Sequence, residues 1–529
     1  MMEEKIKNLI ARFESLEGYR DYWNTHYQEL ADYMLPRKAD IVKKRSRGEK
    51  RMELIYDGTA LQAVDLLSAS LHGMLTSGAA PWFHLTLKND VIAQDDDVRE
   101  WLEDTSGRMM RALNQSNFET EIHEMYVDLV VFGTGCMFSE MDGNRIRFST
   151  RHISEYFIQE DQYGMVDTVF RKYKMAAHQA MARFGDEASD YIKRVFEKKP
   201  DEEVEILHAV YPRKDRDGQK RDNKNMPFAS VYICMQSKML LSESGFEEMP
   251  YVVPRFLKAT GETMGRSPAM VALPDVKMLN LMSKTIIQAA QKQIDPPLLV
   301  PDDGFLLPIR TQPGGLNFYR AGSRDTITPL NTGASISIGL SMEDQRRQAI
   351  RSAFFVDQLL IGGSANMTAT EVIQRQEERM RVIGPVLGRL MNEMLRPLIE
   401  RVFNMMLRND MLAIPPEALQ GRDIDIEYVS PLARAQKSSS LSNTLKALEI
   451  LLPLSEGLPV ADHIDPDGLV RHVADSLGVP KVTMRSQREI AELREARQQQ
   501  QQQQQERQQT QEDVYTAAQA AQAVRMVGQ

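Results

Sequence analysis

The sequence of 529 residues predicts a mixed α+β protein that is mostly helical. Three observations lead to this class. Apolar residues recur at helical spacing over long segments, short β-prone segments cluster within residues 136–260, and Pro- and Gly-rich stretches separate these blocks. Because one hydrophobic core rarely serves more than roughly 250–300 residues, we expect two to four domains.

The composition is that of a soluble globular protein, with 42% hydrophobic and 26% charged residues. Only Cys136 and Cys234 are present, which argues against a disulfide scaffold. The first residues lack the apolar segment of a signal peptide, and no run of about 18 apolar residues occurs. We therefore expect neither a secretion signal nor a membrane span.

The net charge of −9 bears on nucleic-acid binding. Proteins that grip DNA non-specifically are basic, because neutralising phosphates supplies that affinity. This chain is therefore expected either not to interact with DNA or to interact with it without binding it tightly. The 31 Met residues suit helix interfaces that adapt or slide, since Met is unbranched and flexible.

The N-terminal part begins with a predicted helix over residues 3–35, which Pro36 ends. The next segment, residues 37–51, is strongly basic. It is interpreted either as a solvated loop or as a contact with nucleic acid or an acidic partner. Its basic residues are Arg37, Lys38, Lys43, Lys44, Arg45, Arg47, Lys50 and Arg51, against Asp40 and Glu49.

Residues 58–75 predict a second helix whose small residues allow close packing, and residues 82–87 alternate like a short strand. Residues 96–135 are predicted to be helical and to close at Gly133-Thr134-Gly135. The preceding Asp95-Asp96-Asp97 fits an acidic helix N-terminus better than a cation site, because carboxylates favour the positive end of the helix dipole.

The region 136–260 predicts an α+β domain with antiparallel strands, interrupted by helical residues near 175–197. Its strand-like runs are residues 146–148, 166–171, 204–210 and 230–234. Beyond it, residues 275–295 predict a helix that ends at Pro296-Pro297, and residues 296–340 form a Pro- and Gly-rich insertion. Ser341 and Asp344 predict the cap of a further helix, which carries Arg346, Arg347 and Arg351.

An uncharged glycine loop, residues 360–367, then leads into a long helix over residues 368–410. Thr368 and Glu371 form a predicted capping box, in which each side chain satisfies a backbone N–H of the other. Gly384-Pro385 and Pro397 interrupt the helical pattern, because each proline removes a backbone donor and crowds the preceding turn. A glycine loop that feeds a kinked helix describes a mechanical element better than a catalytic one.

The C-terminal part is predicted to be helical over residues 434–453, 466–477 and 483–498. Eight consecutive glutamines, Gln498 to Gln505, lead to an Ala/Gln-rich terminus. This composition fits either a disordered tail or a helical bundle in an assembly.

The motifs of common catalytic and metal sites are missing from the sequence. No G-x-x-x-x-G-K-[ST] occurs, and Gly133-Thr134-Gly135 lacks the third glycine of a dinucleotide fingerprint. The two cysteines lie far apart, and His152, His208, His463 and His472 are isolated, so a zinc site is not expected. The sequence predicts no enzyme, no cofactor and no metal site.

Five segments in a fixed order carry a family resemblance. They are Ala80-Pro81-Trp82-Phe83, Val131-Phe132-Gly133-Thr134-Gly135, Pro254-Arg255-Phe256 through Gly265-Arg266-Ser267-Pro268, Thr368-Ala369-Thr370-Glu371-Val372 and Tyr428-Val429-Ser430-Pro431-Leu432-Ala433-Arg434-Ala435-Gln436. In these segments, within about residues 15–440, the chain resembles the head-to-tail connector, or portal, proteins of short-tailed bacteriophages.

The resemblance implies a portal-type fold with an α/β wing, a two-helix stem, a small clip, a long kinked helix and a helical crown. The implied divisions are wing 1–265, stem helices 266–295 and 341–359, clip 296–340, tunnel loop 360–367, kinked wing helix and following strand 368–429, crown 430–497 and Gln/Ala-rich tail 498–529.

The resemblance also implies roles for individual residues. Gly362, Gly363, Ser364, Asn366 and Met367 would line the DNA channel in the tunnel loop, and Thr368 and Glu371 would cap the helix that kinks at Gly384 and Pro385. The stem would carry Lys284, Arg346, Arg347 and Arg351, and the clip would dock partners through Arg310, Arg320 and Arg324.

The implied protein is a ring of twelve copies at a capsid vertex of the virion, assembled in the host cytoplasm and not in a membrane. Its implied partners are the terminase packaging motor, tail adaptor proteins, the major capsid and scaffolding proteins, and the double-stranded DNA that is packaged and ejected through the ring. Twelve copies of −9 sum to about −108, and such an acidic ring would repel sliding DNA.

Two other classes of phage protein would require different sequence features. A packaging enzyme, either the motor itself or a nuclease, would need a Walker A motif or an acidic metal cluster at matched strand ends. An internal virion or scaffolding protein would need a mostly helical chain without the strand-rich region 136–260.

Overall fold

The computed structural model describes residues 2–46, 48–78, 81–87, 96–217, 222–300, 336–359, 383–419 and 424–428, with residue 220 and short pieces within 308–330 and 444–503. The chain divides into two compact units. The first comprises residues 1–84 and 104–414, and the second comprises residues 85–103 and 415–529. Each unit is described by itself.

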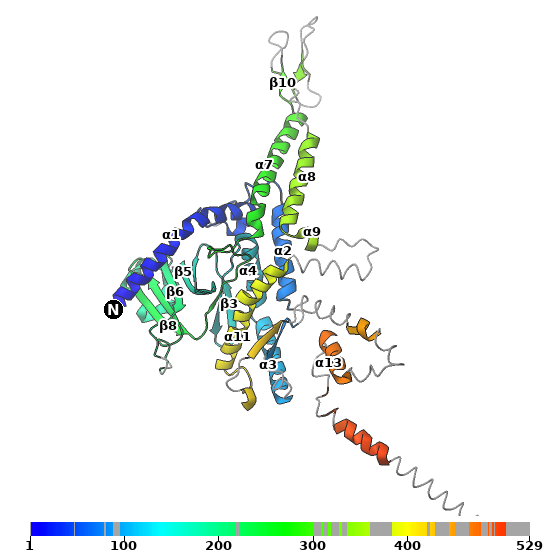
Figure 1. Ribbon diagram of the computed structural model, residues 1–529. Coiled ribbons are helices and arrows are strands. Elements are labelled where there is room, and N and C mark those ends of the chain that lie inside the picture. Colours follow the sequence, from blue (N-terminus) through cyan, green and yellow to red (C-terminus); the bar gives the residue numbers. More distant parts are fainter. Residues whose placement is uncertain are drawn as a thin grey trace, which may run out of the picture. The chain divides into compact units, whose positions relative to one another are not determined.

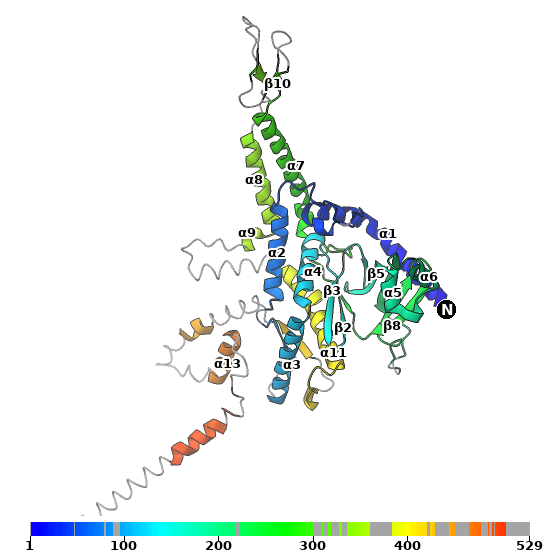
Figure 2. The same cartoon turned by 180° about the vertical axis from the view of Figure 1, so that it is seen from behind.

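A five-stranded antiparallel sheet organises the first unit, in the strand order β4-β5-β6-β7-β8. The strands are β4 (Tyr156–Glu160), β5 (Val166–Ala176), β6 (Glu203–Pro212), β7 (Phe228–Cys234) and β8 (Met239–Phe246). Because side chains alternate along a strand, the sheet has two distinct faces. One face packs against the helix α1 (Met2–Met34) around the fully buried Phe13. The other packs against α5 (Ala177–Phe184) and α6 (Asp190–Lys198), as Figures 1 and 2 show from opposite sides.

A second sheet and a buried helix lie next to this layer. The sheet has three strands in the order β3-β2-β9, with β2 (Met137–Asp142), β3 (Arg145–Thr150) and β9 (Tyr251–Val252). Helix α4 (Phe118–Phe132) is buried along its whole C-terminal half and packs against α2 (Thr59–Leu75). A helix covered on all sides is apolar all round, which explains why its last residues form a continuous hydrophobic run.

A helical hairpin completes the first unit. It consists of α7 (Pro268–Ile294) and α8 (Ile336–Ala353), which lie side by side, followed by the short α9 (Val356–Leu359). Two short paired strands, β10 (Leu298–Leu299) and β11 (Thr328–Pro329), connect to the far ends of the hairpin helices. Together these elements confirm the predicted α+β, mostly helical class.

A return helix follows, over residues 383–408. Its first part, residues 383–390, is α-helical, residues Met391–Leu395 form a π-helical turn, and α11 (Arg396–Arg408) continues it. Short 3₁₀ turns occur at Pro36–Lys38, Gly185–Glu187 and, in the second unit, Glu417–Leu419.

The second unit contains a two-stranded sheet of β1 (Phe83–Leu87) and β12 (Ile424–Tyr428), together with helix α13 (Pro466–Leu477). Residues 444–449 and 492–503 are also helical. Arg494 forms a bidentate ion pair with Asp467 near the start of α13.

The residues predicted to be helical over 96–135 form two helices. The helix α3 (Asp96–Gln115) ends before α4 begins at Phe118. At the break, Ser116 donates a hydrogen bond to the Leu113 carbonyl, and the Asn117 side chain pairs with the backbone of Phe148. Ser and Asn side chains that bind backbone groups compete with helix continuation.

Two predicted helix starts in the hairpin are wrong. The first helix begins at Pro268, not residue 275, because Ser267 caps it and Pro268 occupies its first turn, where a missing N–H costs nothing. The second helix already runs from Ile336, so Ser341 and Asp344 lie inside α8 and do not cap it.

The predicted interruption at Pro397 coincides with an irregular turn, whereas the kink at Gly384 and Pro385 stays a prediction because residues 360–382 lie outside the described part of the chain. Gly384 and Pro385 lie in regular helix, whereas the irregular turn is at Met391–Leu395, just before Pro397. There the Arg396 N–H bonds to the Met391 carbonyl, five residues back. The wider π turn relieves the clash that a proline ring would make with the preceding turn.

Candidate functional site

The hairpin helices are joined by polar contacts in their interface. Ser283 of α7 donates a hydrogen bond of 2.6 Å to Glu343 of α8, and both side chains are buried. Arg346 of α8 forms an ion pair of 2.8 Å with Asp275 of α7. These contacts fix the register of the two helices, because each pairs one turn of α7 with one turn of α8.

The hairpin is tied to the loop before α2. The Asn280 side-chain oxygen accepts hydrogen bonds from the backbone N–H groups of Tyr56 and Asp57, at 2.7 and 3.1 Å. Arg347 of α8 binds the Asp57 carboxylate at 2.9 Å. Burial disfavours the charged form of Asp57, yet hydrogen bonds from Thr59 and Arg347 hold its pKa below the ordinary value. Both helices of the hairpin are therefore anchored at one loop.

Two glycines, Gly133 and Gly265, lie at the base of the hairpin, just before the chain enters α7. Gly133 ends α4 with a φ of 78°, in the left-handed region that favours glycine. A Cβ on Gly265 would lie 2.0 Å from the Gly133 carbonyl oxygen, so the two backbones touch. The Thr134 hydroxyl accepts a hydrogen bond from the Gly265 N–H at 2.8 Å, and Ser267 donates one to the Val131 carbonyl at 2.8 Å. The start of α7 is therefore in close backbone contact with the end of α4 and is not joined to it by a flexible linker.

A buried charge network holds the return helix in the first unit. Arg255 is fully buried and binds both carboxylate oxygens of Glu393, at 2.9 Å each. The backbone N–H of Arg255 also donates to Glu393, and its guanidinium reaches Glu160 at the end of β4. Lys258 shares Glu160 at 2.7 Å. Because Glu393 lies in the π turn, the network ties that turn to two strand ends.

A second buried arginine, Arg401 of α11, binds the central strand β2. Its guanidinium donates to the Ser139 hydroxyl at 2.8 Å and to the Ser139 carbonyl at 2.9 Å. Burial lowers the pKa of Arg401 to about 10, although Glu248 favours its charged form.

Comparison with known proteins identifies the family. The family model of the bacteriophage head to tail connecting protein matches residues 6–484. The chain is 34% identical over 487 residues to the probable portal protein of Bordetella phage BPP-1, covering 89% of this chain and 87% of that one. It is 33% identical over 504 residues to the portal protein of Salmonella phage epsilon15, covering 93% and 90%. The portal protein of Escherichia phage T7 is 21% identical over 490 residues, covering 88% and 86%.

This chain belongs to the bacteriophage head-to-tail connecting protein family. It is a phage portal, a structural and non-enzymatic component of the virion at the head-to-tail junction. The predicted family and function are thereby confirmed. The alternatives of a packaging enzyme or a scaffolding protein are excluded.

The predicted stem residues of this portal have unequal surroundings. Arg346 and Arg347 form ion pairs within the chain, Arg347 with Asp57, Glu343 and Asp344. Lys284 is exposed, with its ammonium 5.6 Å from the Tyr56 ring centre. Arg351 is exposed, and no residue within the described ranges forms an ion pair with it. Arg346 therefore joins the two helices of the portal's hairpin, and Arg347 ties α8 to the loop before α2.

Most other predicted site residues of this portal lie outside the described residues. These are Gly362, Gly363, Ser364, Asn366, Met367, Thr368, Glu371, Arg320 and Arg324. Arg310 is described, and its backbone N–H and carbonyl both pair with the Asn317 side chain, at 2.6 and 2.8 Å. The roles assigned to all these residues stay predictions.

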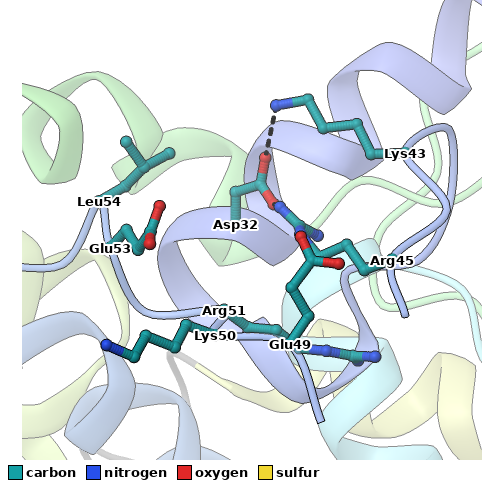
Figure 3. Close-up of a pocket in the computed structure, with 8 residues that line it drawn as sticks. All are labelled: Asp32, Lys43, Arg45, Glu49, Lys50, Arg51, Glu53 and Leu54. Carbon is teal, nitrogen blue, oxygen red and sulfur yellow. Dashed lines mark hydrogen bonds and ion pairs between the residues drawn. The ribbon is translucent and has the colours of Figure 1, made fainter. Parts of the chain in front are cut away.

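The described residues of the basic segment 37–51 form, after a 3₁₀ turn, a mostly exposed loop, as the first interpretation expected. Most of its cations are paired inside the chain: Arg37 with Glu124, Lys38 with Asp128 and Glu124, Lys43 and Arg45 with Asp32, and Arg51 with Asp40. The segment folds over the end of α1 and borders a polar pocket of about 420 Å³ (Figure 3). Acidic Asp32, Glu49 and Glu53 line this pocket together with the basic side chains. We interpret the segment as a surface loop that ion pairs hold against the rest of the chain.

Neither a metal-binding cluster nor a membrane-spanning helix occurs among the described residues. No group of three or more His, Cys, Asp or Glu side chains in that part of the chain could hold a metal ion. Nor is any helix there long and apolar enough to cross a membrane.

Sequence reasoning missed Glu393 and Arg401 as anchors of the return helix. A signal was present, because Arg401 lies seven residues after Met394 and therefore on the same apolar helix face. A charge on an apolar face indicates a buried partner. The partners Arg255 and Ser139 could not be identified without the fold.

Proposed function

We propose that the protein forms a closed ring of twelve copies, the channel through which phage DNA enters and leaves the capsid. In this proposal the hairpin of α7 and α8 is the stem, residues 296–340 are the clip, and residues 360–367 are the tunnel loop. The family assignment supports a ring at the head-to-tail junction.

One observation carries the self-assembly. On α7, Val271, Met278 and Leu281 are 73%, 49% and 66% exposed. They lie at helical spacing on one face, opposite the face that includes the buried Val276 and Leu279. Such an exposed apolar stripe on a long helix indicates an interface. In a ring every copy presents the same stripe to its neighbour.

Leu281→Asp tests this interface. We expect wild-type chain to give rings near twelvefold in native mass spectrometry and the variant to give mainly monomers. Burying one Leu contributes about 1.5–3 kcal/mol, and an aspartate there would in addition be desolvated. Gln291→Asp, an exposed position on another side of α7 from the stripe, should still form rings. A monodisperse wild-type monomer at micromolar concentration would contradict the proposal.

The proposed conduit handles DNA by repulsion rather than by binding. A ring of twelve copies would carry a charge of about −108, which favours sliding of a polyanion over retention on the wall. The exposed clip would dock the terminase motor and later tail adaptor proteins, with Arg310, Arg320 and Arg324 as candidate contacts. Capsid and scaffolding proteins would surround the ring at the vertex.

Replacing both Gly362 and Gly363 with Ala tests the tunnel loop. Glycine reaches backbone angles that are closed to alanine, so the double variant should restrict the loop. We expect rings to form normally in native mass spectrometry, while DNA packaging or retention in assembled particles falls severalfold. Full packaging by the variant would argue against a gating role for this loop.

A further inference from the structure

A row of polar and aromatic side chains crosses the sheet face opposite α1. Arg171 of β5, His208 of β6 and Tyr232 of β7 are direct cross-strand partners. The His208 and Tyr232 rings are stacked, with centres 4.1 Å apart and planes 3° apart. His208 is buried, and its ring nitrogens pair with the Tyr251 hydroxyl at 2.8 Å and the Ser230 hydroxyl at 3.0 Å. The row is therefore rigid.

Three guanidinium groups border this row. Arg171 lies over the Tyr173 ring at 3.9 Å, Arg183 of α5 lies over the Tyr232 ring at 4.8 Å, and Arg151 lies over the Phe138 ring at 5.4 Å. Aromatic faces hold the guanidinium planes but leave the N–H donors at their edges available. The arginines are thus oriented without all their donors being used.

The arginines are incompletely neutralised. Arg171 binds Glu155 at 2.9 Å, and Arg183 donates to the Tyr232 hydroxyl at 2.8 Å. The Arg151 side chain has neither a hydrogen-bond acceptor nor an ion-pair partner in the described part of the chain, and its Nε atom is buried. Burial and the neighbouring Arg171 charge lower the pKa of Arg151. The cluster therefore contains one cation, Arg151, that lacks an anionic partner in that part of the chain and is repelled by the neighbouring Arg171.

A buried hydroxyl lies beside these groups. Tyr173 is 8% exposed, and its hydroxyl has no hydrogen-bond partner in the described residues. Burial raises the pKa of Tyr173, and the charges of Arg183, Arg171 and Arg151 act in the opposite direction. Arg171 lies over the Tyr173 ring itself, Arg183 over the Tyr232 ring of the same row, and Arg151 over Phe138, whose ring centre is 6.0 Å from that of His208. A buried unpaired hydroxyl costs free energy unless a ligand satisfies it.

We propose that Arg151, Arg171, Arg183 and the Tyr173 hydroxyl form a binding site for a small phosphate species. The three arginines carry +3, and Glu155 and Glu140, the carboxylates that act on them, carry −2, which leaves +1. A phosphate ion supplies the missing negative charge and several acceptor oxygens, and guanidinium groups match that geometry. Arg171 and Tyr173 are only 13% and 8% exposed, which favours a small ion over a polymer, whereas Arg183 is exposed.

Titration of the purified full-length chain with sodium phosphate tests the site. At constant ionic strength, phosphate should raise the thermal unfolding midpoint and give a saturable binding isotherm, whereas sodium chloride and sodium acetate should not. Arg151→Gln should weaken phosphate binding at least about tenfold, and Tyr173→Phe about tenfold, because each removes a donor to a charged ligand. Arg147→Gln, a nearby exposed arginine 3.7 Å from Asp142, is the matched control and should bind like wild type.

A second readout separates binding from a purely structural role. Without phosphate, Arg151→Gln should unfold at the same temperature as wild type or higher, since it removes an unpaired cation from a repulsive site. A lower midpoint would mean that Arg151 serves packing, and would overturn the proposal. So would unchanged phosphate binding in Arg151→Gln, or a response to acetate in the absence of one to phosphate.

Discussion

Gly265→Ala should be among the most damaging single substitutions in this chain. A Cβ at this position would lie 2.0 Å from the Gly133 carbonyl oxygen, a distance that no relaxation of a side chain can relieve. Because the clash is between backbones, the junction of α4 and α7 would have to separate. We expect a loss of at least about 4 kcal/mol in stability, measured as a collapse of soluble yield and of the thermal unfolding midpoint.

Two other glycines calibrate this effect. Gly133→Ala should also destabilise strongly, because its Cβ would lie 2.5 Å from the Gly265 carbonyl oxygen and its φ is positive. Gly388→Ala, at an exposed helical position with open space around it, should instead stabilise by roughly 0.5–1 kcal/mol. If Gly265→Ala behaved like Gly388→Ala, the close backbone junction would be wrong.

This junction shows what sequence reasoning reached and where it ended. Gly133-Thr134-Gly135 was correctly interpreted as a structural turn and not as a nucleotide site. Its physical reason, contact with Gly265, depends on a segment far away in the chain. Local rules describe the left-handed end of α4, but only the fold shows which backbone lies against it.

Local rules also failed where two of them conflicted. The first hairpin helix was predicted from its apolar face to start at residue 275, although the Ser267 cap and Pro268 already marked the true start. The Ser341-x-x-Asp344 pattern fitted a cap, yet residues 336–340 extend the helix beyond it. In the second case packing between α7 and α8 stabilises a longer helix than the terminus signals alone indicate.

The five-stranded sheet illustrates a third limit. Three of its strands were predicted from β-prone runs, whereas β4 and β8 were not. Neither the strand order nor the register can be derived from those runs, and it is the register that brings Arg171, His208 and Tyr232 into one row. In the sequence His208 was one isolated histidine, and only the sheet places it among three arginines.

Glu393→Gln should loosen the return helix more than any surface change can. The substitution removes the Glu393 carboxylate from the fully buried Arg255 and leaves it only Glu160, and removing one member of a buried ion pair typically costs about 3–5 kcal/mol. Because Glu393 lies in the π turn, the loss should concentrate in residues 383–408. Amide hydrogen exchange there should accelerate by about a hundredfold or more, while exchange in the five-stranded sheet changes less.

Arg408→Gln provides the control on the same helix. Arg408 forms a bidentate pair with Glu248 at 2.6 and 2.7 Å, but its side chain is 42% exposed, so water screens the pair. Such pairs contribute only about 0–1 kcal/mol, and exchange should rise a few-fold at most. Equal effects of the two substitutions would show that burial of the Arg255–Glu393 pair is not what holds the return helix in place. A strong effect of Glu393→Gln alone would assign that role to the pair, and through it to the π turn that precedes Pro397.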